Sequence, residues 1–363
     1  MRIKSLDALR GLAALLVVIH HLYLVALGDG VAAAWPAATP LNIVVLGRPN
    51  VILFFVLSGY VLTLPFLGHE PQGYGRYLLK RFCRLYLPFV AAILASAVLY
   101  AVIAPGPIPA LGDWFNTDSW NTPLGWEMLA RHLLMTGLPG DGGLDNVMWS
   151  LVYELRISLI FPLLVLFVRT GPLRALMLTL LGFGLLDYAI AHFGIRPPFY
   201  GPTPALSLLV TAYFTTFFVF GIVLAMEAES IGMALAKMKP WALGVLWMVA
   251  IIALSPRADL ANGIGASLLI ILSAKSGVGA DLLNRPSLQW LGRVSYSLYL
   301  THLLVILAAV HLLYGLIPLW AILVGSVPVS LIVAETAYRL VEAPAMTLGR
   351  RLSRRNRFGV ARA

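Results

Sequence analysis

Long apolar segments follow one another along nearly the whole chain, and they constrain its fold more than any other feature. Windows of about 20 apolar residues, the length that a helix needs to cross a bilayer, predict roughly ten spans. The spans lie near 6–28, 43–67, 85–104, 147–168, 175–193, 205–226, 241–255, 260–274, 290–313 and 317–341. We therefore expect an all-α integral membrane protein, a bundle of about ten transmembrane helices.

The composition excludes a soluble fold. Of 363 residues, 60% are hydrophobic and 12% charged, and the mean hydropathy of +0.87 lies above that of soluble domains. The single cysteine, Cys83, provides neither a disulfide pair nor zinc-site spacing. No polar run is long enough for a separate soluble domain. We expect one transmembrane domain over residues 1–345 and a basic cytoplasmic tail over 346–363.

The net charge of +10 follows from topology rather than from a nucleic-acid partner. With the N-terminus placed inside, the inner segments hold most of the basic residues, including those of the tail. The outer segments hold only Arg48, Arg131, Arg196 and Arg257. This bias predicts that both termini are cytoplasmic, where basic residues also meet anionic membrane lipid.

One predicted outer loop, 105–146, is long for a connection between helices. It is acidic and rich in tryptophan, with Asp113, Trp114, Asp118, Trp120, Trp126, Glu127, Asp141 and Asp145. Such a loop is typical of an interfacial lid or a surface that stacks against sugars. It is equally typical of an aromatic belt at the membrane interface, and the sequence leaves both alternatives open.

The first predicted span carries Arg10, His20 and His21 at positions where ionisable groups are costly and usually functional. Arg10 and His21 are eleven residues apart, which places them about 20° apart on one helical face and roughly 16 Å apart along the axis. His20 lies about 80° away. One face of this helix therefore lines a polar path through the bundle.

The fourth predicted span carries Glu154 and Arg156 within apolar surroundings. Glu154 and His21 both lie about seven residues, or about 10 Å, inside the outer boundaries of their spans. A carboxylate beside a histidine orients the ring as a general base, so we expect His21 and Glu154 to form a catalytic pair. The alternative is that each group bonds a backbone carbonyl and only joins helices.

A basic cluster, GRYLLKRFCRLYLP, follows the second predicted span on the cytoplasmic side. It contains Arg76, Lys80, Arg81 and Arg84, several of which share one helical face. Guanidinium groups bind phosphates bidentately, so the cluster suits the phosphates of a cytoplasmic donor. It also suits a surface that faces anionic lipid.

The ninth predicted span begins with LGRVSYSLYLTH, which brings Tyr296, Tyr299 and His302 toward one face. We expect His302 to line the same cavity as His21. Glu342, after the last span, is expected at the membrane interface, paired with the basic tail. The sequence contains no glycine-rich phosphate loop, no HExxH motif and no histidine or carboxylate cluster spaced for a metal.

Together these motifs resemble the acyltransferase-3 family of polytopic bacterial membrane enzymes, from LDALRGLAALLVVIHH to LVEAP. The family's intramembrane histidine eleven residues after an arginine matches His21, and its RxxR motif falls on Arg81 and Arg84. Further matches are Phe54, Phe55, Ser58, Gly59, Trp149, Ser150, Leu151, Glu154, Ser295, Tyr296, Tyr299, His302, Glu342 and Pro344. Ile52 and Leu155 stand where many members have acids, which leaves Glu154 to carry the acidic role.

The resemblance implies an inner-membrane O-acyltransferase that moves an acyl group from cytoplasmic acyl-CoA to a hydroxyl on the outer side. The acyl group it leads us to expect is acetyl. The acceptor would contain a saccharide or be linked to a lipid, and no metal would be needed. His21 and Glu154 would be catalytic, and Arg10, Arg81 and Arg84 would bind the donor. The other cavity-lining residues would be Ser58, Trp149, Tyr296, Tyr299 and His302.

Two mechanistic routes stay open at this point, because His21 can act as a general base or carry the acyl group itself. The chain ends about twenty residues after its last span, so we expect no fused extracytoplasmic esterase-like domain. A proton-coupled transporter that uses the same histidine and glutamate is the main alternative. A non-catalytic assembly subunit, whose charged positions tolerate alanine, is a third.

Overall fold

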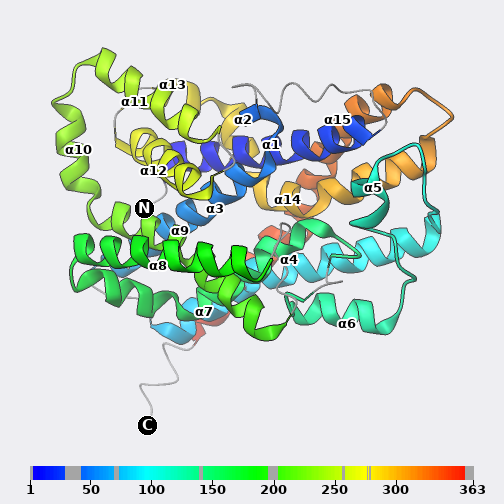
Figure 1. Cartoon of the computed structure of the whole chain (residues 1–363), viewed down its shortest axis with the longest axis horizontal. Helices are drawn as coiled ribbons and strands as arrows, with labels where there is room; N and C mark the ends of the chain where they lie inside the picture. The colour runs from blue at the N-terminus through cyan, green and yellow to red at the C-terminus, as the bar shows by residue number, and fades with distance from the viewer. Residues whose placement is uncertain are drawn as a thin grey trace, which may run out of the picture.

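The computed structural model describes residues 3–28, 42–68, 73–138, 142–194, 203–255, 258–275, 277 and 279–355. Arg2, Asp141, Arg196, Arg257 and 356–363 of the predicted tail lie outside this part. Within it the chain is helical, with no β-strand, and eight helices are long and apolar enough to cross a membrane. The predicted all-α membrane bundle is confirmed. Figure 1 shows most long helices running along the long axis of the molecule, with α5 and α6 toward one end and α10 at the other.

The eight long helical segments are named here in chain order. They are α1 (Lys4–Gly28), α3 (Gly47–Thr63) with η2 (Leu64–Phe66), α4 (Tyr74–Ile103), η3 (Asn146–Met148) with α7 (Trp149–Arg169), α8 (Pro172–His192), α9 (Pro204–Met226), α14 (Pro286–Leu313), and α15 (Leu319–Ala337) with η4 (Tyr338–Glu342) and α16 (Ala343–Arg355). The shorter helices are α2 (Asn42–Val45), α5 (Asp113–Thr117), α6 (Trp126–Leu134), α10 (Ala228–Ala236), α11 (Pro240–Ala253), α12 (Asp259–Lys275) and α13 (Ala280–Leu283).

Each of the ten predicted spans coincides with a helix, but two of these helices are short. Helix α11 has 14 residues and α12 has 17, and the two pack against each other. At 1.5 Å per residue they are about 21 and 26 Å long, less than the roughly 30 Å hydrocarbon core of a bilayer. Eight helices rather than ten therefore have the length and composition of a full span in the described residues.

Glycine pairs let the central helices approach closely. A Cβ atom added at Gly11 on α1 would overlap the backbone around Gly292 on α14, and one added at Gly292 would overlap the backbone of Asp7. Gly59 on α3 and Gly221 on α9 meet in the same way. Because lipid is as apolar as the side chains, such close backbone contacts are a main source of helix association in a membrane.

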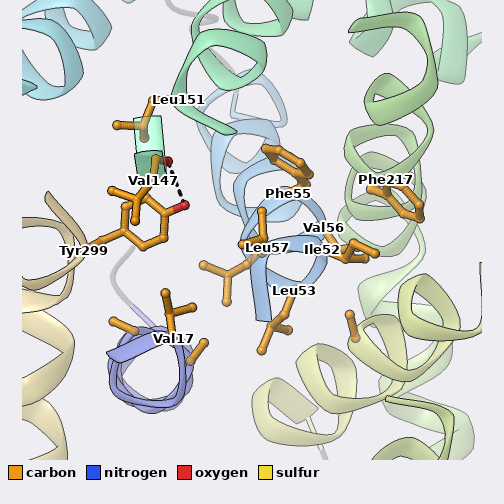
Figure 2. Packing of buried hydrophobic residues seen from close by; sticks show 14 of the residues in the cluster. Val17, Ile52, Leu53, Phe55, Val56, Leu57, Val147, Leu151, Phe217 and Tyr299 are labelled. Atoms are coloured by element: carbon orange, nitrogen blue, oxygen red, sulfur yellow. Dashed lines mark hydrogen bonds between the residues drawn. The ribbon is translucent and has the colours of Figure 1, made fainter. Parts of the chain in front are cut away.

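The two helices α1 and α14 run parallel from the glycine contact. Ten residues beyond Gly11 lies His21, and ten residues beyond Gly292 lies His302. The rise of both helices over that length is about 15 Å, so the two histidines reach the same level. Figure 2 shows buried apolar side chains in this part of the bundle, among them Val17 of α1, Leu57 of α3, Leu151 of α7 and Tyr299 of α14.

The long segment between α4 and α7 folds against one end of the bundle. Trp120 is buried and its indole N–H donates to Ser96 on α4 over 3.0 Å, while Ser96 donates to the Leu144 carbonyl over 2.6 Å. The Leu144 N–H in turn donates to the His132 ring over 3.0 Å. Of the three tryptophans only Trp126, which is 85% exposed, has the exposure expected of an aromatic belt.

Glu342 lies inside the protein, so its predicted position at the interface is wrong. Its side chain is buried and accepts a hydrogen bond from Ser297 on α14 over 2.6 Å. The reason is that the helix does not end at Glu342 but continues through η4 into α16, which packs along α4. The first part of the predicted tail therefore belongs to the helical bundle.

The glycine contact between α1 and α14 predicts a measurable effect on stability. We expect Gly292→Ala to lower the free energy of unfolding by about 1–3 kcal/mol, because the new methyl group overlaps backbone and forces the helices apart. Gly325→Ala on α15, where a Cβ meets nothing within 4 Å, is the matched control and should be neutral or slightly stabilising. Thermal unfolding of the purified protein in detergent measures both, and equal changes would contradict the packing argument.

Candidate active site

Two cavities with polar linings lie one after the other along α1 in the described part of the bundle. The first, the arginine cavity, has a volume of about 80 Å³, and its polar lining is Arg10, Ser58, Arg81, Arg84, Ser150, Glu154, Ser295, Tyr296 and Tyr299. The second, the histidine cavity, has a volume of about 220 Å³ and is lined by Val17, His20, His21, Leu24, Gly47, Arg48, Val51, Trp114, Asp118, Asn146, Val147, Trp149 and Tyr299. The structure thus separates the predicted cationic residues from the predicted base.

Arg10 connects α1 to α14 at the arginine cavity. Its guanidinium donates to Ser295 Oγ over 2.9 Å and to the Gly292 carbonyl over 3.0 Å. The same group forms an ion pair with Asp7 at 3.4 Å, one turn earlier on α1. Arg10 lies next to Gly11, so the close approach of the helices at that glycine is what brings these partners within reach.

Arg81 and Glu154 form an ion pair that joins α4 to α7. Arg81 Nη2 lies 2.5 Å from Glu154 Oε1, and Arg81 Nε donates to Ser158 Oγ over 2.9 Å. Ser58 on α3 donates to the same Glu154 oxygen over 3.0 Å. The exposed fractions of the two charged side chains are 7% and 14%, so the pair is largely removed from solvent. Buried charges at this depth need such mutual neutralisation.

The prediction that Glu154 and His21 contact each other is therefore wrong. Glu154 lines the arginine cavity and is bonded to Arg81 and Ser58, whereas His21 lines the other cavity. Equal depth in two spans does not make two residues neighbours, because α7 packs mainly on α9, α4 and α8, while α1 packs mainly on α14 and α3.

Arg84 stands out among the guanidinium groups of the arginine cavity. Arg10 has Asp7 and Arg81 has Glu154, but Arg84 forms neither a hydrogen bond nor an ion pair within the described residues. Its side chain is only half-buried, so the charge remains accessible from the cavity. The carboxylates of Glu342 and Glu154 attract Arg84 without forming an ion pair with it, and a guanidinium without a direct partner in a partly open cavity is suited to a phosphate or another anion.

The partner of His21 is His302 on α14. His302 Nε2 lies 3.1 Å from His21 Nδ1, and His302 Nδ1 lies 2.9 Å from the Leu298 carbonyl. His302 is fully buried behind His21 and lines neither cavity, so the prediction that it faces the cavity is wrong. His21 is also buried, and the carbonyl of Val17, one turn earlier on α1, lies 2.9 Å from its Nδ1.

These contacts define which nitrogens carry protons when both rings are neutral. A carbonyl only accepts, so His302 Nδ1 carries the proton that is donated to Leu298, and His302 Nε2 is an acceptor. Both neighbours of His21 Nδ1, Val17 O and His302 Nε2, are then acceptors, and this nitrogen must carry the proton. His21 Nε2 is left unprotonated, as a general base or nucleophile requires.

The rest of the histidine cavity combines aromatic rings with hydrogen-bonding groups. The Trp114 ring lies 5.4 Å from the His21 ring, centroid to centroid, and the His20 ring lies 5.0 Å from it. Asn146 donates to Asp118 over 3.0 Å. Burial raises the pKa of Asp118, while hydrogen bonds from Thr117 and Asn146 oppose the shift.

Arg48 is a cavity residue that the sequence did not single out. It forms a bidentate ion pair with Asp259 at the start of α12, and Tyr213 on α9 donates to the same carboxylate over 2.8 Å. Its guanidinium also lies over the Phe214 ring, 5.7 Å from the centroid. These three residues, from α9 and α12, position a cation in the wall of the histidine cavity. Only its position in a predicted outer segment hinted at such a role.

The remaining predicted residues are divided between the cavities. Ser58 and Tyr296 line the arginine cavity, Trp149 lines the histidine cavity, and Tyr299 lines both. Tyr296 donates to the Leu85 carbonyl over 2.7 Å. In the described part of the chain, no three histidine, cysteine, aspartate or glutamate side chains converge in a way that could hold a metal ion.

Comparison with known proteins gives a match along most of the chain. Residues 3–339 match the family model described as Acyltransferase domain. The chain is similar to an O-acetyltransferase, PaAT-1, of Phomopsis amygdali, with 28% identity over 43% of this chain and 38% of that protein. It is also similar to the peptidoglycan O-acetyltransferase OatA of Listeria monocytogenes, with 25% identity over 94% of this chain.

The lengths of these relatives differ from that of the chain. The match covers 55% of the Listeria protein, so the chain spans about half the length of some of the relatives it matches. Nodulation protein 10 of Rhizobium leguminosarum is 25% identical over 95% of this chain and 94% of its own length. No solved structure gives a significant match.

The ion pair of Arg81 and Glu154 predicts non-additive effects on stability. We expect Glu154→Ala and Arg81→Ala each to cost about 3–5 kcal/mol, because each leaves its partner buried without a counter-charge. The double variant should be less destabilised than the sum of the two single variants, since neither charge remains. Unfolding of the four proteins in detergent completes the double-mutant cycle. Additive losses would show that the two side chains do not depend on each other.

Proposed function

We propose, since the chain belongs to the Acyltransferase domain family, that it is a membrane-embedded O-acyltransferase. In this proposal an acyl group moves from cytoplasmic acyl-CoA to a hydroxyl of a saccharide-containing acceptor on the outer side of the bacterial inner membrane. The acyl group that we propose is acetyl. The observation that carries the proposal is that two cavities lie next to each other. One contains a guanidinium without a direct ion pair, and the other contains an unprotonated imidazole nitrogen. The names of the O-acetyltransferase relatives agree with this proposal.

The donor would occupy the arginine cavity. Arg84 would bind a phosphate of CoA, with Arg10 and Arg81 adding positive charge beside it. The other lining residues are mainly apolar, including Phe54, Phe55 and Leu57, and suit the thin pantetheine arm. The excess of basic residues in the predicted cytoplasmic segments supports a position of this cavity toward the cytoplasm, where acyl-CoA is made.

The acceptor would occupy the histidine cavity. Aromatic rings of Trp114 and Trp149 provide faces against which a sugar ring packs, and Asp118 and Asn146 provide groups that hydrogen-bond to hydroxyls. The cavity lies next to α5, in the segment predicted to be extracytoplasmic. A saccharide or a lipid-linked saccharide is therefore the acceptor class that the lining supports.

The chemistry would be a general-base transfer at His21. Its Nε2 accepts the proton of the acceptor hydroxyl while the hydroxyl oxygen forms a bond to the thioester carbonyl carbon. The carbon–sulfur bond then breaks, and the proton passes from the imidazolium to the leaving CoA thiolate. His302 acts through His21, because its Nε2 accepts from His21 Nδ1–H and so holds the required tautomer. Glu154 contributes through Arg81 and the donor cavity rather than as the partner of His21.

The alternatives receive less support. The family match and the named relatives provide no link to proton-coupled transport. A transporter also has no need for an anion-binding group such as Arg84 beside the bundle core. A non-catalytic subunit would not need a defined tautomer at His21. That tautomer depends on two buried histidines, and the burial of ionisable groups in a membrane protein is costly.

Replacement of the base predicts loss of turnover with retained donor binding. We expect His21→Ala to lower kcat by about 10²–10⁴, the contribution typical of a general base. His302→Phe, which keeps a ring but removes the acceptor for His21 Nδ1–H, should lower kcat less and leave KM for acetyl-CoA unchanged. Acetyl transfer to a saccharide acceptor, followed with the purified variants, measures both. Full activity of His21→Ala would refute the assignment.

Replacement of the unpaired guanidinium predicts weaker donor binding. We expect Arg84→Ala to lose about 1.5–3 kcal/mol of binding free energy, the net strength of a hydrogen bond to a charged group, or roughly 10- to 150-fold in Kd. Stabilisation by acetyl-CoA reports this, since a ligand at a hundred times its Kd adds about 2.7 kcal/mol to the free energy of unfolding. Arg174→Ala, an exposed residue at the start of α8, is the control. Unchanged affinity of Arg84→Ala would leave the basic cluster as a surface for anionic lipid.

A further inference from the structure

Tyr299 stands between the two cavities. It lines both of them, as does Val51 on α3, and no other residue among those described is shared by their linings. The Tyr299 side chain is buried, and its ring packs edge-on against Phe54 with centroids 5.7 Å apart. On the other side, His302 lies one turn further along α14, with the two ring centroids 6.2 Å apart. The aromatic ring is therefore held in place by neighbours on α3 and α14.

The Tyr299 hydroxyl is held at the start of α7. It donates to the Val147 carbonyl over 3.1 Å, as Figure 2 shows, because a carbonyl only accepts. Ser150 Oγ lies 2.8 Å from the same hydroxyl and then serves as the donor to it. Ser150 lines the arginine cavity and Val147 lines the histidine cavity. The two hydrogen bonds hold the hydroxyl at the boundary between the cavities.

This position matters because of the reaction proposed above, on which the present inference rests. The thioester would arrive in one cavity, while the base and the acceptor hydroxyl would lie in the other. Reacting atoms must approach to about 3–3.5 Å before transfer, so the side chain between them has to move. Without acceptor, an open passage would expose the thioester to water that His21 can activate. Water then forms the new carbon–oxygen bond, the carbon–sulfur bond breaks, and the products are a carboxylic acid and the CoA thiol.

We propose that Tyr299 is a partition that shields the donor thioester from water until the acceptor is bound and moves aside for acyl transfer. The role is one of positioning and exclusion, and it requires no proton transfer by Tyr299 itself. A purely structural tyrosine, which only joins α14 to α7, makes a different prediction. Its removal would weaken stability, donor binding and transfer together. Removal of a partition instead produces a new activity, hydrolysis of acyl-CoA without acceptor.

The test compares thiol release from acetyl-CoA without acceptor in the purified wild type and in variants of the partition. We expect Tyr299→Ala to raise this hydrolysis by about tenfold or more, because water is no longer excluded, while stabilisation by acetyl-CoA is retained. Tyr299→Phe and Ser150→Ala keep the ring but remove hydroxyl contacts, and should raise it by a smaller factor. In the double variant Tyr299→Ala with His21→Ala, hydrolysis should return to the wild-type background.

Tyr86 provides the matched control. Its hydroxyl also donates to a backbone carbonyl, that of Leu133, over 2.8 Å, and its half-buried ring lines neither cavity. Tyr86→Phe and Tyr86→Ala should leave hydrolysis at the wild-type rate. A Tyr299→Ala protein that binds acetyl-CoA and hydrolyses it no faster than wild type overturns the partition. If that variant does not fold, wild-type rates in both Tyr299→Phe and Ser150→Ala overturn it instead. Failure of the wild type to bind acetyl-CoA would count against the proposed function and is read separately.

Discussion

The close contact of α1 and α14 at Gly11 and Gly292 determines much of the site. Because the two helices run parallel from this contact, equal rises of ten residues bring His21 to His302, and the long side chain of Arg10, next to Gly11, reaches Ser295. A bulkier residue at either glycine would separate both pairs at once, because each helix is stiff and shifts as a unit when the contact widens. The backbone contact thus positions Arg10 of the arginine cavity and His21 of the histidine cavity together.

The two cavities differ in how they stabilise polar groups in an apolar medium. The arginine cavity balances permanent charges, with Asp7 against Arg10 and Glu154 against Arg81. Around His21 the nearest groups are neutral rings and backbone carbonyls, so its orientation depends on hydrogen bonds rather than on a counter-ion. In the proposed function, these separate environments would let an anionic donor and a neutral hydroxyl acceptor be bound by different means in one bundle.

The sequence predicted the spans well because apolar length is a local property, and every predicted segment is helical. It identified Arg10 and His21 as functional candidates because ionisable groups at such depth are rare, and Arg81 and Arg84 because a basic cluster suits phosphates and matches the RxxR motif of the family. It could not predict which of them meet. Depth along a span is one coordinate, and the neighbour and rotation of each helix are two others, which depend on packing. Glu154 and His21 share a depth but face different helices, whereas His302 reaches His21 through a contact made ten residues earlier.

The distribution of direct ion pairs sets Arg84 apart from the other arginines of the cavity and supports its proposed role as the anion-binding group. Three arginines line the first cavity, and two of them already have an acidic partner in the described residues. A further carboxylate beside Arg84 would stabilise the empty protein but would have to be displaced by each incoming phosphate. Leaving the guanidinium half-exposed in the cavity costs stability, and the entry of an anion offsets that cost. In the proposed function a phosphate-bearing donor would therefore be bound mainly by Arg84, the one of the three cavity arginines that forms no direct ion pair in the described residues, since the carboxylates of Glu342 and Glu154 act on it only from a longer distance.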